Sequence, residues 1–163
     1  MNGDDIPQSF QKGEAFEQYL RNRIFTKSQY SIVEKTHGFH ENNGDYIEST
    51  LHPDFKLRDL TNDREFYLEA KFRTNVFDTT INWCHYRQLL RYRDFNKVLP
   101  LFIALGIGRT ADDPYNVFIL PLHEAGHTDL YLSIVNKFKI GLDAPLSSQL
   151  LWNRYNPKLR KAG

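Results

Sequence analysis

The sequence predicts an α/β protein in which a mixed central β-sheet is flanked by helices. Segments 99–108 and 115–122 are continuous apolar runs, typical of strands that are buried on both faces. Segments 9–25 and 81–98 instead place their apolar side chains at helical spacing. With three strands between these helices, the expected order is α-β-β-β-α-β-β-α, and residues 1–163 are expected to form a single domain.

The first helix is expected to start at a cap on Ser9 and to bury one arc of its surface. A strand over 29–39 and a polar loop over 40–45 follow it. After the apolar strands, the sequence predicts a helix over 128–138 and a short helix with a basic tail over 147–163. The buried arc of the first helix contains Phe10, Phe16, Leu20 and Ile24.

The helix over 81–98 is expected to turn Tyr86, Leu89 and Leu90 toward the core, with Trp83 beside them. Cys84 lies on the same apolar side and is interpreted as a core residue rather than a nucleophile.

The composition excludes several classes of protein. The first ten residues are too polar for a signal peptide, and no apolar run is long enough to span a membrane. A single cysteine allows no internal disulfide. These features together predict a cytoplasmic protein.

Residues 52–73, HPDFKLRDLTNDREFYLEAKFR, predict a β-hairpin with charged side chains on one face. Alternation along its second strand places Glu69 and Lys71 opposite the apolar side chains. In the first strand, Asp54 shares its face with Lys56 and Arg58. The apolar faces contain Phe55, Leu57, Phe66, Leu68, Ala70 and Phe72.

The turn of this hairpin is expected at Asn62 and Asp63. A turn centred there pairs Leu57 with Leu68, so that apolar side chains meet. The same register pairs Phe55 with Ala70, Asp54 with Lys71, and Lys56 with Glu69. The two carboxylates and the lysine of the hairpin therefore converge at its open end.

Asp54 and Glu69 are predicted to form a metal site. Two hard oxygen donors suit Mg²⁺ or Mn²⁺, which keep water ligands and accept phosphate oxygens. Such an ion can activate a water molecule, and Lys71 beside it can orient that water or stabilise developing negative charge. The pattern E-x-K also occurs on solvated faces of alternating charge, so this second interpretation stays open on the pattern alone.

The segments Pro53-Asp54 and Glu69-Ala70-Lys71 resemble the signature of the PD-(D/E)XK nuclease superfamily. The core of that superfamily has the order αβββαβ, which matches residues 10–121 and leaves 122–163 as a C-terminal helical segment with a basic tail. The resemblance implies a restriction-endonuclease-like fold and metal-dependent hydrolysis of DNA that leaves a 5′-phosphate.

By the same resemblance, the metal ligands are Asp54, Glu69 and the backbone carbonyl of Ala70, and Lys71 completes the catalytic set. The segment KGEAFE, residues 12–17, resembles the first-helix motif in which a glutamate lies near the metal. Glu17 lies within the apolar arc of the helix, where a carboxylate needs a partner or an ion. Glu14 lies at the edge of that arc and is the weaker candidate.

The segment QLLRY, residues 88–92, is similar to the Q-x-x-x-Y element of the RecB-like branch. Gln88 and Tyr92 are four residues apart and hence lie on one helical face. There they would contact substrate phosphate or hold the metal site in place. Ordinary helix packing, with Tyr92 half-buried, is the alternative.

Basic side chains provide candidate contacts to DNA, the expected partner. Arg87 and Arg91 are one turn apart on the helix of Gln88, and Lys56 lies on the charged face of the hairpin. Phosphate contacts supply most of the affinity of such proteins. The chain would act alone, as a homodimer or within a larger DNA-processing complex.

The segment HEAGH, residues 123–127, matches the H-E-x-x-H signature of zinc proteases. That chemistry needs both histidines on one face of a continuous helix and a third ligand. Pro121 and the strand that runs into the motif favour a loop and helix cap instead.

A nuclease-like fold that only binds DNA or a partner is the alternative from another class. The joint presence of Asp54, Glu69 and Lys71 favours the enzyme. The sequence leaves open whether cleavage is internal or terminal, which strands are cleaved, the sequence specificity, the oligomeric state and the biological role.

Overall fold

The computed structural model describes residues 8–36, 52–76 and 78–155. The end of the expected strand over 29–39, the loop over 40–45 and the basic tail lie outside these residues. No helix within the described ranges is long and apolar enough to cross a membrane.

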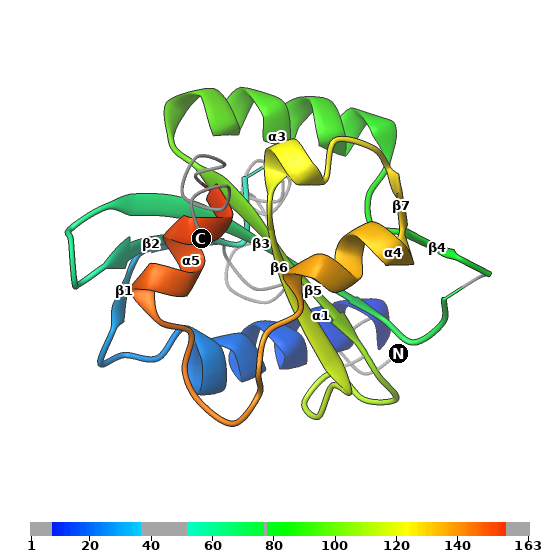
Figure 1. Cartoon of the computed structure of the whole chain (residues 1–163), viewed down its shortest axis with the longest axis horizontal. Helices are drawn as coiled ribbons and strands as arrows, with labels where there is room; N and C mark the ends of the chain where they lie inside the picture. Colours follow the sequence, from blue (N-terminus) through cyan, green and yellow to red (C-terminus); the bar gives the residue numbers. More distant parts are fainter. Residues whose placement is uncertain (1–7, 37–51, 77, 156–163) are drawn as a thin grey trace, which may run out of the picture.

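Five strands form the main sheet of the described residues, in the spatial order β1-β2-β3-β5-β6 (Figure 1). Strand β3 runs parallel to β5, and the other neighbouring pairs are antiparallel. The sheet is therefore mixed, as the sequence predicts. The strands are β1 (Tyr30–Lys35), β2 (Phe55–Asp59), β3 (Glu65–Arg73), β5 (Leu101–Ile107) and β6 (Asn116–Pro121).

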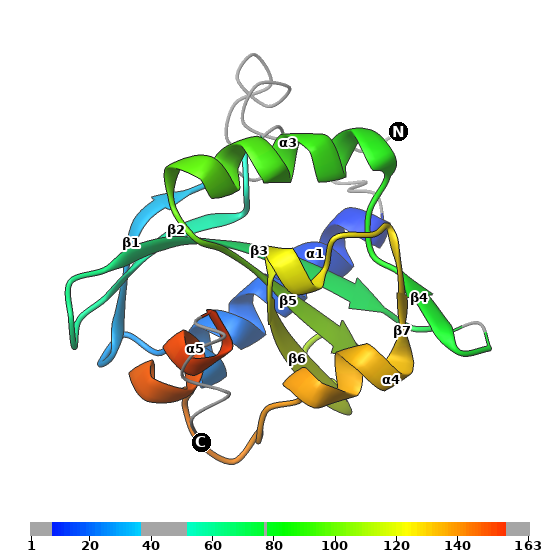
Figure 2. The same ribbon diagram turned by 45° about the horizontal axis from the view of Figure 1, so that its top comes forward.

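Helices cover both faces of the main sheet (Figure 2). Helix α1 (Gln8–Tyr19), its π-helical extension (Leu20–Ile24) and α5 (Ser148–Tyr155) pack on one face. Helix α3 (Tyr86–Val98) covers the other face, together with α4 (Leu132–Val135) and the 3₁₀ turns Leu122–Glu124 and Asn136–Phe138.

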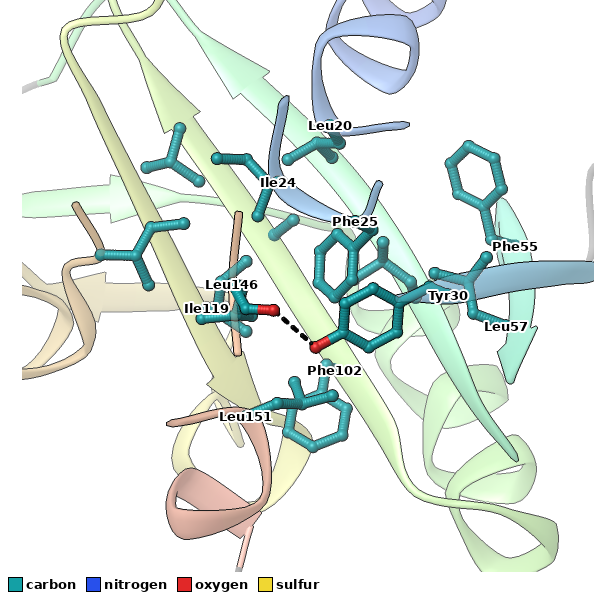
Figure 3. Packing of buried hydrophobic residues seen from close by; sticks show 14 of the residues in the cluster. Leu20, Ile24, Phe25, Tyr30, Phe55, Leu57, Phe102, Ile119, Leu146 and Leu151 are labelled. Atoms are coloured by element: carbon teal, nitrogen blue, oxygen red, sulfur yellow. Dashed lines mark hydrogen bonds between the residues drawn. The ribbon is translucent and has the colours of Figure 1, made fainter. Parts of the chain in front are cut away.

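Of the arc predicted for the first helix, Phe16, Leu20 and Ile24 are buried, at most 1% exposed, while the side chain of Phe10 lies outside the described part of the structure. Figure 3 shows Leu20 and Ile24 close to Phe25 and Tyr30, whose hydroxyl donates a hydrogen bond to the carbonyl of Leu146 (2.8 Å). Gly106 of β5 allows the Phe16 ring of α1 to pack closely on the sheet, because a Cβ at position 106 would lie 2.5 Å from that ring.

A second sheet was not predicted. Strand β4 (Thr80–Asn82) pairs antiparallel with β7 (Asp129–Tyr131), in segments where the sequence suggested helix starts. Trp83 fixes this arrangement through two hydrogen bonds. Its indole Nε1–H donates to the backbone carbonyl of His127 (2.6 Å), and its backbone N–H donates to the backbone carbonyl of Thr128 (3.0 Å). These tertiary contacts override the helical pattern, and α3 begins only at Tyr86.

The inward face of α3 differs from the prediction at two positions. Leu89 and Trp83 are buried, but Tyr86 is 64% and Leu90 41% exposed. Tyr86 and Leu90 lie one turn apart on the same side of α3, and the buried face of the helix runs through Leu89 and Tyr92 instead. Cys84 is buried as predicted.

The register of the β2–β3 hairpin differs from the prediction by two residues. Phe55 pairs with Leu68, and Leu57 with Phe66. The connection is a four-residue loop over 60–63 rather than a two-residue turn, and Asp63 adopts a positive φ of 60° within it. A two-residue shift keeps every side chain on its predicted face but changes its partner.

Asp59 fixes this longer loop. Its carboxylate is fully buried and accepts hydrogen bonds from the Thr61 backbone N–H, the Ser148 hydroxyl and the Trp152 indole N–H. The latter two donors lie on α5, so Asp59 joins the hairpin to the C-terminal helix. The guanidinium of Arg64 lies over the Trp152 ring, 3.6 Å from its centroid.

Replacement Asp59→Ala should lower the free energy of unfolding by about 2–4 kcal/mol, because it leaves buried donors without an acceptor. Urea denaturation measures this loss, and Asp94→Ala is the control. Asp94 is exposed and pairs with Lys97 across one helical turn, so its loss should cost about 0.5 kcal/mol or less. Equal stability of the two variants would contradict the anchoring role of Asp59.

Candidate active site

Three carboxyl groups meet at one end of the β2–β3 hairpin. Glu17 comes from α1, Asp54 immediately precedes β2, and Glu69 lies in β3. The side chain of Asp54 is hydrogen-bonded to those of both Glu17 and Glu69. A hydrogen bond between two carboxyl groups needs a proton on one of them, so these contacts favour the protonated forms of Glu17 and Glu69.

The backbone of β3 fixes Asp54 at the centre of the cluster. Oδ2 of Asp54 accepts a hydrogen bond from the backbone N–H of Ala70 (2.7 Å). Continuing the observed register one step beyond Phe55 and Leu68 places Asp54 opposite Glu69, not opposite Lys71 as predicted. The two carboxyl groups therefore meet directly across the strand pair.

Burial and mutual repulsion disfavour ionisation of this cluster. Burial, followed by the charge of Asp54, raises the pKa of Glu17 to about 9. The same two causes raise the pKa of Glu69 well above its ordinary value, and the charge of Lys71 only partly offsets them. In a poorly hydrated site, each negative charge makes ionisation of the neighbouring carboxyl group less favourable. The cluster therefore favours a proton or a cation between its oxygens.

Lys71 lies two residues after Glu69 on the same face of β3. Its charge stabilises the ionised form of Glu69, and its Nζ lies 6.0 Å from the centroid of the Tyr92 ring. The side chain is half-buried at the rim of the carboxyl cluster. The structure thus brings Asp54, Glu69 and Lys71 together as the sequence suggested, although through a different register.

Tyr92 is buried, not half-buried, and touches the cluster directly. Its hydroxyl is hydrogen-bonded to Glu69, and burial together with that carboxylate raises the pKa of Tyr92. The ring stacks on Trp83, with centroids 5.5 Å apart and planes 18° apart. Gln88 has a separate task in the structure, since its Oε1 accepts the backbone N–H of His85 (2.9 Å) and caps α3.

The predicted basic contacts differ in their exposure to solvent. Arg87 is exposed on α3, and Arg91 is half-buried. Lys56 pairs with Tyr67 rather than with Glu69, and its Nζ lies 4.0 Å from a carboxylate oxygen of Glu34. The prediction that Lys56 pairs with Glu69 is therefore wrong, because the register of the hairpin is shifted by two residues.

Sequence reasoning missed Lys35 at the end of β1. Lys35 pairs with Phe55, the residue next to Asp54, and its charge lowers the pKa of Glu17. It therefore lies on the α1 side of the cluster, away from Lys71. The pairing of β1 with β2 shifts register between Ile32 and Glu34, so simple alternation along the strand could not have indicated this neighbour.

The HEAGH segment does not form the helix that a zinc protease needs. Strand β6 ends at Pro121, and Leu122–Glu124 form a single 3₁₀ turn. His123 Nε2 lies 3.9 Å from a carboxylate oxygen of Glu124, and the backbone carbonyl of His127 is the acceptor for Trp83. The zinc-protease alternative is therefore wrong. The segment is a loop after a core strand, as predicted, but it leads into β7 and does not cap a helix.

The donor chemistry of the carboxyl cluster fits a small hard cation. Among the described residues, no three His, Cys, Asp or Glu side chains are spaced as a metal-binding group. Mg²⁺ does not require such a group, because it commonly takes one or two carboxylates and keeps several waters. The carbonyl of Ala70 points to the same strand edge as its N–H, toward Asp54. Two carboxylates and this carbonyl thus supply suitable oxygens.

The fold matches that of solved structures. One is Hjc, a Holliday junction resolvase from the archaeal hyperthermophile Archaeoglobus fulgidus. The TM-score is 0.54 at 14% sequence identity, over 80% of this chain and 92% of that chain. No protein-family model and no curated protein matches the sequence. The chain therefore shares the fold of this resolvase, and its mixed sheet flanked by helices agrees with the restriction-endonuclease-like fold that was expected.

Without divalent cations, the raised pKa of Glu17 should make stability fall as the pH rises from about 4.5 to about 9. In this window the folded state keeps a proton that the unfolded state has lost, and one full proton corresponds to about 1.4 kcal/mol per pH unit. Urea denaturation in chelator at several pH values measures the slope, which Glu17→Gln should reduce.

Glu14→Gln is the matched control on the exposed side of the same helix and should change the slope much less, because the charge of Glu14 is the smallest contribution to the raised pKa of Glu17. Mg²⁺ should raise stability most at high pH, because it binds the ionised carboxylates. An unchanged slope in Glu17→Gln would mean that this carboxyl group is not the one that retains the proton.

Proposed function

We propose that the chain is a divalent-metal-dependent deoxyribonuclease that hydrolyses DNA phosphodiester bonds. The observation that carries this proposal is the meeting of Glu17, Asp54 and Glu69 beside Lys71, on a fold shared with a Holliday junction resolvase. Buried carboxyl groups with raised pKa values, such as Glu17 and Glu69, cluster at functional sites. Their mutual repulsion destabilises the fold, so packing alone does not account for them.

Asp54, Glu69 and the carbonyl of Ala70 would hold the ion, Mg²⁺ or Mn²⁺, with Glu17 assisting directly or through water. When bound, the ion supplies a more acidic water and offsets charge on the phosphate. The Ala70 N–H keeps Asp54 aimed at the cluster, and the Tyr92 hydroxyl does the same for Glu69.

Lys71 is the proposed catalytic cation. From the rim of the cluster its ammonium group can orient the attacking water or stabilise negative charge that develops on the phosphate. Glu69 next to it, whose ionised form is favoured by the Lys71 charge, keeps the lysine near the reacting atoms. Lys35 on the opposite side of the cluster adds a positive charge that suits a neighbouring phosphate.

DNA is the proposed partner, bound through phosphate contacts from α3 and the hairpin. Arg87, Arg91, Gln88 and Lys56 are the proposed contacts, and Tyr92 acts through Glu69. A homodimer or a larger DNA-processing complex would place a second site on the same duplex.

Cleavage assays on linear, circular and single-stranded DNA test the proposal. Cleavage with Mg²⁺ or Mn²⁺ that chelator abolishes is the expected result, and the ends should carry 5′-phosphate. A module that binds DNA without cleaving it under any of these conditions would be the non-catalytic alternative.

Asp54→Ala and Glu69→Ala should reduce cleavage at least about a thousandfold, because the ion loses its anionic ligands. Lys71→Ala should reduce cleavage similarly while DNA affinity changes less than about threefold, since one lysine is a small part of a multi-phosphate contact. Glu14→Ala and His127→Ala are folded controls that should cleave normally. A wild-type rate in Lys71→Ala would remove the catalytic role of this lysine.

Arg87→Ala should weaken DNA binding more than turnover. It should also lower the slope of log affinity against log salt by about one, because one phosphate contact is lost. Binding measured at several salt concentrations gives this slope. Arg154→Ala on α5 is a control outside the proposed contact surface, and a slope equal to that of this variant would exclude Arg87 from the interface.

A further inference from the structure

A pocket of about 550 Å³ lies beside the N-terminal half of α3. The helix contributes Tyr86, Leu89 and Arg93 to one wall, and the HEAGH segment and β7 form the other. At 100° per residue, these three side chains occupy the face next to the one that carries Gln88 and Tyr92. The pocket is thus distinct from the carboxyl cluster but shares a helix with it.

Two tyrosines at this pocket are exposed to solvent. Tyr86 is 64% and Tyr131 63% exposed, and both line the pocket from opposite walls. Large aromatic side chains usually lose most of their exposure on folding because burial of their rings stabilises the protein. Exposed rings at a pocket are suited to stack a flat ligand, and a nucleobase is the flat ligand that a DNA-binding protein encounters.

The charges of the pocket favour a base over a phosphate. Carboxylates of Glu124 and Asp129 line it, and they disfavour entry of another anion. The nearest cation, Arg93, donates a hydrogen bond to the carbonyl of Gly126 within the same wall (3.1 Å). A base offers amino and ring N–H donors to carboxylates, while its phosphates remain outside the pocket.

Contacts connect the pocket to the proposed catalytic cluster. The carbonyl of His127 in the pocket wall accepts the Trp83 indole N–H, and Trp83 stacks on Tyr92, which is hydrogen-bonded to Glu69. Tyr86 and Tyr92 are six residues apart, which is roughly 9 Å along the helix axis. At about 3.4 Å per stacked nucleotide, a base in the pocket would lie two or three nucleotides from the cleaved bond.

We propose that this pocket binds an unpaired base of the DNA substrate and so directs cleavage to positions a fixed distance from it. A paired base cannot enter without breaking its pair and leaving the stack, which costs a few kcal/mol. The substrate class is therefore DNA with an unpaired or displaced base, not continuous duplex. This inference rests on the proposed nuclease function and adds its selectivity.

The test compares cleavage of two duplexes that are identical except for one unpaired base. Wild-type protein with Mg²⁺ should show a kcat/KM about tenfold or more higher on the second duplex, in keeping with the usual strength of base–aromatic stacking. The double variant Tyr86→Ala/Tyr131→Ala should lose this preference but keep its rate on the paired duplex. Tyr86→Phe/Tyr131→Phe should retain the preference, because the rings remain.

Tyr115→Ala is the matched control, since Tyr115 is also 63% exposed but lies outside the pocket. A second readout places 2-aminopurine at the unpaired position, where stacking on tyrosine should quench its fluorescence in wild type and not in the Ala/Ala variant. Equal cleavage of both duplexes by wild type, or an unchanged preference in the Ala/Ala variant, would overturn the pocket proposal alone. Absence of cleavage on every DNA would instead overturn the nuclease function, and this inference with it.

Discussion

The hydrogen bond from the Ala70 backbone N–H to the Asp54 carboxylate is the contact on which the candidate site depends. Beyond Phe55 and Leu68, β2 no longer pairs with β3, so the edge of β3 would otherwise lack an acceptor at Ala70. The Asp54 side chain takes the place of a strand at this position. In doing so it comes to interact with both Glu17 and Glu69.

This arrangement places carboxyl groups that repel one another when ionised inside a well-packed part of the fold. Three carboxyl groups with little hydration destabilise the fold whenever they ionise without a cation. The surrounding contacts must offset that cost: Phe16 packs tightly over Gly106 on the side of α1, and Asp59 ties the far end of the hairpin to α5. The hairpin is therefore fixed at its loop by the hydrogen bonds of Asp59, whereas repulsion between carboxylates acts at its open end.

The sequence predicted the faces of the strands better than their partners. Alternation of apolar and charged side chains assigned Glu69 and Lys71 to one face, and a two-residue shift of register does not change that assignment. The shift arises from the loop, because the buried Asp59 accepts hydrogen bonds from Thr61 and from Ser148 of α5. No local pattern reveals a partner 89 residues away. For the same reason, the pairing of β4 with β7 and the position of Lys35 depend on tertiary contacts that periodicity cannot show. The starts of the helices predicted over 81–98 and 128–138 were wrong, because these segments form β4 and β7 and Trp83 is hydrogen-bonded between them.

The stack of Trp83 on Tyr92 gives these unpredicted segments a role at the site. Trp83 is fully buried because β4 and the HEAGH segment enclose it, and its ring in turn restricts the ring of Tyr92. A tyrosine fixed in this way holds its hydroxyl on Glu69 with little loss of side-chain freedom when substrate arrives. The small second sheet thus supports the carboxyl cluster from behind α3, although it supplies no charged group to it. The HEAGH segment, whose sequence suggested zinc chemistry, therefore contributes to the site through the backbone carbonyl of His127. Any residue that keeps the loop conformation would provide this carbonyl.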